Sequence, residues 1–149
     1  MKAKKILILI IAVHLITTGF SYSAGHDIAG IKEVIIMLEK SIKPPFMSKD
    51  WNKKRIIWLN MLQQAGANFS VIKKVILQLD QNIRMDAYKT EHQSAVAEWH
   101  LYLSSADSVK LIYQALMEIN SSLDINARQD NWSTEEIKWI ARIKVNSNQ

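Results

Sequence analysis

Residues 69–103, FSVIKKVILQLDQNIRMDAYKTEHQSAVAEWHLYL, contain neither Gly nor Pro and decide the fold class. In the first half of this stretch, apolar side chains recur every three or four residues, the spacing of one face of an α-helix. They are Phe69, Ile72, Ile76, Leu79 and Ile83. From Tyr88 onward the apolar positions are shifted around the helix, and Thr90 and Gln93 have the spacing of a capping box. We therefore expect two helices with a break between Asp86 and Thr90.

The rest of the chain shows the same helical periodicity. We expect helices over residues 27–42 and 48–65, the first stopped by Pro44 and Pro45 and the second ended by Gly66. Asn68 should cap the helix that begins the central stretch. A further helix should be capped by Ser104 or Ser105 and end near residue 126, and a capping box at Ser133–Glu136 should begin the last one.

No alternating strand pattern occurs, and we recognise no internal repeat in the sequence. The pattern predicts an all-α protein, a compact helical bundle of five or six helices. Residues 24–149 have the length of a single helical domain.

The N-terminus has the order of a secretory signal peptide. Lys2, Lys4 and Lys5 precede an apolar run over residues 6–16, and small and polar residues follow. We expect a signal peptide over residues 1–23, cleaved before Ala24, and a mature protein that is periplasmic or secreted. The alternative is an uncleaved anchor, but the apolar run is shorter than the roughly 20 residues that span a bilayer. We therefore predict that the mature protein has no stable membrane anchor after cleavage.

The amino-acid composition excludes several classes of function. The chain has no Cys, which excludes thiol catalysis, thiolate metal sites and disulfides. Removal of residues 1–23 leaves 16 basic and 14 acidic side chains, a net charge of +2 that does not suggest nucleic acid as a partner.

Charge is distributed unevenly along the chain. Residues 32–55 carry a net charge of +4, whereas residues 80–136 carry −6. Neighbouring antiparallel helices could neutralise one another, which is the ordinary explanation. The alternative is an acidic surface that meets a basic partner.

Histidine chemistry is weakly supported by the sequence. His92 and His100 are eight residues apart, so on one helix they lie about 12 Å apart along the axis and cannot share a metal ion. Two histidines at the edge of a bundle explain them equally well, although a haem, metal or other ligand carried at either residue stays open as an alternative. We predict no cofactor and no metal site.

Catalysis is also weakly supported. No Gly-x-Ser-x-Gly motif and no Gly-rich phosphate loop occurs. Glu91 and Glu98 share a helix face about 10 Å apart, which leaves a wall-associated hydrolase as a second alternative, but solvated charges explain them too. We predict that the protein is not an enzyme.

Five Trp residues are the other distinctive feature. Core packing is the default explanation for them, and a protein interface or sugar stacking is the alternative. Trp139 is the strongest surface candidate, because it does not share a face with Ile137, Ile140 and Ile143. The candidate partner-binding residues are Trp139, Trp99, Glu91, Glu98 and Asp107.

These observations favour an exported helical protein that binds another protein. The most concrete form is an immunity or inhibitor protein that neutralises a toxin or cell-wall hydrolase in the periplasm, the partner presenting a basic surface to the acidic segment.

Overall fold

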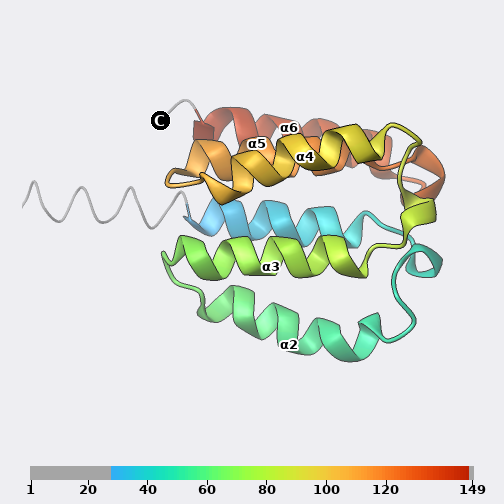
Figure 1. The fold of residues 1–149 in the computed structure, drawn as a ribbon, viewed down its shortest axis with the longest axis horizontal. Coiled ribbons are helices and arrows are strands. Elements are labelled where there is room, and N and C mark those ends of the chain that lie inside the picture. Colours follow the sequence, from blue (N-terminus) through green and yellow to red (C-terminus); the bar gives the residue numbers. More distant parts are fainter. Residues whose placement is uncertain (1–27, 148–149) are drawn as a thin grey trace, which may run out of the picture.

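The computed structural model describes residues 28–147 and confirms the all-α prediction (Figure 1). Helical residues 28–40 are followed by five α-helices: α2 (Trp51–Gln64), α3 (Phe69–Asn82), α4 (His92–Ser104), α5 (Val109–Ser122) and α6 (Trp132–Ser147). A 3-10 turn joins the two helices of each consecutive pair: η1 (Pro44–Phe46) precedes α2, η2 (Met85–Ala87) lies between α3 and α4, and η3 (Ile125–Ala127) lies between α5 and α6. The predicted signal peptide lies outside the described residues. Within residues 28–147, no helix is both long and apolar enough to cross a membrane.

The six helices form three modules of the same construction. Each module has an inner helix, a 3-10 turn and an outer helix, and the modules span residues 28–64, 69–104 and 109–147. Trp58, Trp99 and Trp139 occupy the same place in the three outer helices, 41 and then 40 residues apart. The inner helices likewise share an equivalent position, occupied by Ile31, Ile72 and Ile112. The expectation of no internal repeat is therefore wrong. Few side chains are identical among the modules, so the repetition lies in burial and hydrogen bonding.

The three turns hydrogen-bond to one another in a closed cycle. In each contact a backbone N–H just before one turn donates to the last carbonyl of another turn over 2.8 Å. The pairs are Arg84 to Phe46, Asp124 to Ala87 and Lys43 to Ala127. Isolated antiparallel bridges repeat the cycle: Met47 with Ile83, Tyr88 with Leu123, and Ile42 with Arg128. The last pair joins the first turn to the third, so the modules close into a ring with pseudo-threefold symmetry. All three turns lie at one end of the molecule, the turn end, at the right in Figure 1.

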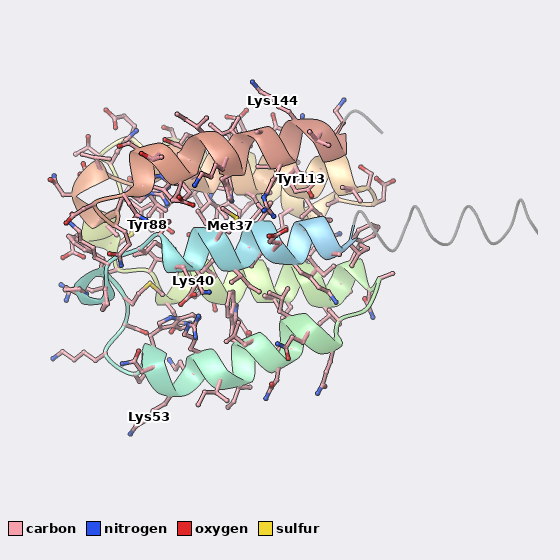
Figure 2. All side chains as sticks on the ribbon, turned by 180° about the vertical axis from the view of Figure 1, so that it is seen from behind. Met37, Lys40, Lys53, Tyr88, Tyr113 and Lys144 are labelled. Atoms are coloured by element: carbon pink, nitrogen blue, oxygen red, sulfur yellow. The ribbon has the colours of Figure 1, made fainter. Side chains whose placement is uncertain are left out.

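The inner helices form the centre, and each outer helix covers the next inner helix. Ile31, Ile72 and Ile112 are fully buried. The indole Nε1 of Trp58 donates to the carbonyl of Val75 in α3 over 2.9 Å. The equivalent Trp139 of α6 donates to the carbonyl of Val34 in the first helix over 3.0 Å, so the ring closes through the outer helices as well. Tyr113 lies among the helices, whereas Lys53 and Lys144 point outward on opposite sides (Figure 2).

The central stretch is broken as predicted, although the break is longer. Helix α3 ends at Asn82, and η2 separates it from α4. Asn68 caps α3 by accepting from the backbone N–H groups of Ser70 and Val71. Gly66 has φ of +54°, the left-handed backbone that the predicted C-cap requires.

Four of the predicted helix starts are displaced. Helix α2 begins at Trp51 rather than Ser48, whose hydroxyl instead donates to Asn82 Oδ1. Helix α4 is preceded by Glu91, without a side-chain cap, rather than by Thr90. Ser108 caps α5 in place of Ser104 or Ser105, and α6 is already helical at Trp132, one residue before the predicted N-cap. Before α2, α4 and α6, the backbone N–H groups of Ser48, Lys89 and Gln129 donate to other modules, contacts that local spacing does not reveal. Helix α5 instead follows a loop without a 3-10 turn.

The apolar residues of α6 are buried differently from the expectation, although Ile143 is buried and Ile140 packs against the core. Trp139 is fully buried, while Ile137 is 71% exposed. Trp132 and Trp139 pack edge to face with centroids 6.1 Å apart, as Trp51 and Trp58 do at 5.5 Å in α2. The buried face of each outer helix is thus set by two positions seven residues apart.

Substitutions in α6 can test this face. Trp139→Ala should lower the free energy of unfolding by about 3–5 kcal/mol, because it empties a buried site and removes a bond that closes the ring. Ile137→Ala should change it by no more than about 0.5 kcal/mol, because that side chain is exposed. Urea unfolding measures both, and equal losses in the two variants would contradict the assignment.

Candidate functional site

The structure separates the five predicted partner-binding residues into two groups. Glu91, Glu98 and Asp107 are exposed. Trp99 and Trp139 are 0% exposed, so the prediction that they present an aromatic surface is wrong. Both indoles fill the space between an outer helix and the neighbouring inner helix, which explains why a large apolar side chain occupies these positions.

Exposed carboxylates line one flank of α4. Tyr102 donates its hydroxyl to Glu98 Oε1 over 3.1 Å, and the charge of Glu118 on α5 also acts on that phenol. Together Glu91, Glu98 and Glu118 form what we call the acidic strip, and Asp107 lies beyond the other end of α4. Within residues 28–147, none of these four carboxylates forms an ion pair.

Other acidic groups of residues 80–136 are neutralised by partners. Three form ion pairs: Asp86 with Arg84, Asp130 with Lys43, and Glu135 with Lys138. Charge neutralisation therefore explains part of the acidic segment. The carboxylates without an ion pair within residues 28–147 include the acidic strip and also Asp80, Asp107, Asp124 and Glu136.

An apolar groove follows the opposite flank of α4, between α3 and α4. It encloses about 540 Å³ and is lined by Lys73, Leu77, Ala97, His100, Leu101, Leu103 and Ser104. Leu101 is 64% exposed on the crest between the groove and the acidic strip. We call the acidic strip, this crest and the groove together the α4 ridge.

The groove exists because α4 departs from the other two outer helices. Leu59 and Ile140 pack against the core at the position where His100 is exposed in α4. Ala97 stands where α2 and α6 carry Ile56 and Ile137. Leu59 and Ile140 thus cover core that the exposed His100 leaves open on α4, whereas Ile56 and Ile137 are themselves 66% and 71% exposed.

A second departure lies inside the same helix. His92 takes the place of Trp51 and Trp132, and its ring stacks on Tyr88 with centroids 3.6 Å apart. The hydroxyl of Tyr88 donates to Asp80, and burial together with that carboxylate raises the pKa of Tyr88 well above its usual range. His92 Nδ1 and Trp99 Nε1 are buried and have no hydrogen-bond partner in the part of the chain that the structure describes.

These groups do not assemble a metal site. Among residues 28–147, no three His, Asp or Glu side chains are placed to hold one ion together. His92 is buried while His100 is exposed, so the two histidines present different surroundings. Glu91 and Glu98 lie on the outer surface of α4, where water solvates them.

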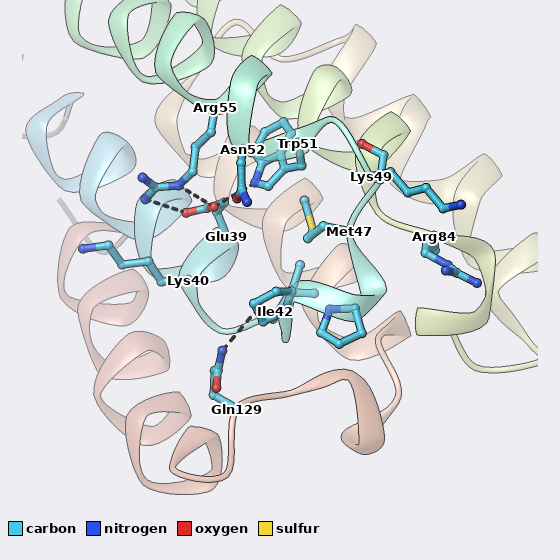
Figure 3. A pocket seen from close by; sticks show the side chains of 13 residues that line it. Glu39, Lys40, Ile42, Met47, Lys49, Trp51, Asn52, Arg55, Arg84 and Gln129 are labelled. Atoms are coloured by element: carbon cyan, nitrogen blue, oxygen red, sulfur yellow. Dashed lines mark hydrogen bonds and ion pairs between the residues drawn. The ribbon is translucent and has the colours of Figure 1, made fainter.

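A cleft at the turn end lies beside η1 (Figure 3). It encloses about 590 Å³. Glu39, only 7% exposed, accepts from Trp51 Nε1 over 3.0 Å and from Arg55 Nε and Nη2 over 2.7 and 3.1 Å. This bidentate pair fixes one wall of the cleft. Sequence reasoning missed the cleft, because its lining comes from residues 39–55 on two helices and the turn between them, completed by Arg84 and Gln129 from the other two modules. The only available signal was the net charge of +4 over residues 32–55.

Comparison of the chain with protein-family models, with curated proteins and with solved structures finds no match.

The buried histidine makes stability depend on pH. Burial lowers the pKa of His92, the neighbouring charge of Asp80 opposes that shift, and His100 adds to it. Because the folded state prefers the neutral ring, its contribution is complete above about pH 6.5 and is lost as the pH falls through the lower folded-state pKa. His92→Phe keeps a ring on Tyr88 and removes the titration. Its urea midpoint should fall less than that of the wild type between about pH 7.5 and about pH 5.

His100→Gln is the matched control, because His100 is exposed and is the smallest of the three influences on the His92 pKa. This variant should keep most of the pH dependence of the wild type. Equal flattening in both variants, or in neither, would contradict the role assigned to His92.

Proposed function

We propose that this is an exported, non-enzymatic helical protein that binds another protein through the α4 ridge. Its most concrete form is an immunity or inhibitor protein that neutralises a toxin or cell-wall hydrolase in the periplasm. The observation that carries the proposal is the combination on one helix of unpaired carboxylates, an exposed Leu101 and an apolar groove. The basic and apolar order of residues 2–16 supports export.

The α4 ridge has the chemistry of a protein interface. Stable interfaces place apolar contacts at the centre and charged groups at the rim. Here the groove and Leu101 supply the apolar part, and Glu91, Glu98 and Glu118 supply the charged rim on one side. A partner with a basic patch beside an aliphatic side chain would complement both. Such charge complementarity raises the association rate and rejects acidic partners.

The internal repetition supports the choice of α4. Helices α2 and α6 have the same role in the fold, yet at the groove positions they carry Ile56, Leu59, Ile137 and Ile140. The fold therefore does not require Ala97 and His100. Residues that the fold does not require, gathered on one surface, are explained by a contact outside the chain.

A second candidate function rests on a different observation. The unpartnered Nδ1 of His92 and Nε1 of Trp99 are buried polar atoms, which a bound ligand could satisfy. A ligand-, haem- or metal-carrying bundle would use these groups. It predicts a visible absorbance band or stoichiometric metal in the purified protein, and colourless, metal-free protein would exclude haem and metal.

Binding and inhibition assays with the toxins or wall hydrolases encoded by neighbouring genes test the first proposal. The wild type should bind one of them and suppress its activity. Leu101→Asp should weaken that binding by about 100-fold or more, because it places a charge at the apolar centre of the contact. Ile137→Asp introduces the same charge on the exposed face of α6 and should stay within about threefold of the wild type.

Two outcomes would refute the assignment. Failure of the protein to bind any of these enzymes or to protect cells that produce them would remove the inhibitor proposal. Equal weakening of binding by Leu101→Asp and Ile137→Asp would show that the contact does not lie on α4.

A further inference from the structure

The cleft at the turn end carries uncompensated positive charge. Lys40 and Lys49 are exposed on its opposite sides (Figure 3), and within residues 28–147 neither forms an ion pair or hydrogen bond through its ammonium group. Arg55 is neutralised by Glu39, and Arg84 by Asp86. The cleft therefore keeps two free ammonium groups after its internal pairs are formed.

The other two modules show that this charge is not needed for folding. The residues equivalent to Lys40 are Gln81 and Ser121, and those equivalent to Lys49 are Thr90 and Asp130. All three modules fold in the same way and form the same turn contacts. The positive charge is thus specific to the first module.

The lining suits a peptide better than a small ion. Its floor is apolar and includes Ile42, Pro44 and Met47. Asn52 and Gln129 place side-chain amides beside that floor, and amides can pair with a peptide backbone in both directions. Gln129 Nε2 donates to the carbonyl of Ile42 over 3.5 Å, which leaves its second N–H and its oxygen for a ligand. A volume of about 590 Å³ lies within the size range of binding pockets for organic ligands.

We propose that this cleft binds an acidic peptide segment, with carboxylates on Lys40 and Lys49 and apolar side chains on Ile42, Pro44 and Met47. The site goes beyond the proposed function: it lies beside η1 rather than on the α4 ridge, and it selects the opposite charge. The Glu39–Arg55 pair and Trp51 hold its wall in place before binding, which lowers the ordering cost of association.

Fluorescence anisotropy with a labelled peptide of alternating Glu and Leu tests the proposal. The purified protein should bind this peptide and should not bind a peptide of alternating Lys and Leu. The double variant Lys40→Gln/Lys49→Thr gives the cleft the residues of the second module. It should weaken binding at least about tenfold, since two charge-assisted contacts are lost, and should keep the wild-type urea midpoint.

Lys74→Gln/Lys110→Thr is the matched control, because both lysines are exposed outside the cleft and their loss changes the net charge equally. It should bind the acidic peptide within about twofold of the wild type. Equal weakening in both double variants would show general attraction to a basic protein and overturn the site. Absence of binding to the acidic peptide would overturn it as well. Displacement of the peptide by inorganic phosphate at the same concentration would assign the cleft to small anions instead.

Discussion

Three backbone hydrogen bonds between turns that are distant in sequence hold the inner helices together at one end. Lys43 donates to Ala127, Arg84 to Phe46 and Asp124 to Ala87. Backbone polar groups that leave a helix must find partners if they are buried, and here each turn supplies them to another. Since the third bond joins the first module to the last, no module has an unpaired turn. The placement of every outer helix follows from this ring, because each helix starts a few residues after its turn.

Comparison of the three modules also distinguishes the residues that the fold requires from those that it does not. The buried tryptophans at positions 58, 99 and 139 are the same in all modules, and each fills the space against a neighbouring inner helix. Two surfaces break the repetition. On α4, Ala97 and His100 line an apolar groove beside an acidic strip, and at η1 two free lysines flank a cleft. Opposite charges on separate surfaces allow one small domain to contact two chemically different groups without competition between them.

Local patterns predicted the class of structure and several of its boundaries. The period of the apolar residues in 69–83, the Asn68 cap and the turn at Gly66 depend only on neighbours along the chain, and the structure confirms them. The predicted start at Ser48 is displaced to Trp51, because the backbone N–H of Ser48 donates to Asn82 of the second module. Helix α6 begins at Trp132, one residue before the predicted cap at Ser133. The exposure of Trp139 could not be read from its own helix. Spacing alone places Ile137, Ile140 and Ile143 on one apolar face. In the structure Ile143 is buried and Ile140 packs against the core, while the contact of Trp139 with the first helix leaves Ile137 exposed.

The sequence by itself determined the helical content, the absence of disulfides and the uneven distribution of charge, because these depend on composition and on spacing within one helix. The sequence also predicted Glu91, Glu98 and Asp107 as surface residues that meet a partner, and the structure places all three on the surface. Tertiary structure alone decided the closed ring, the burial of Trp99 and Trp139, and the meeting of residues from three modules in one cleft. These features depend on contacts between residues as far as 105 positions apart, and no local pattern along a helix encodes which of several apolar faces will meet another.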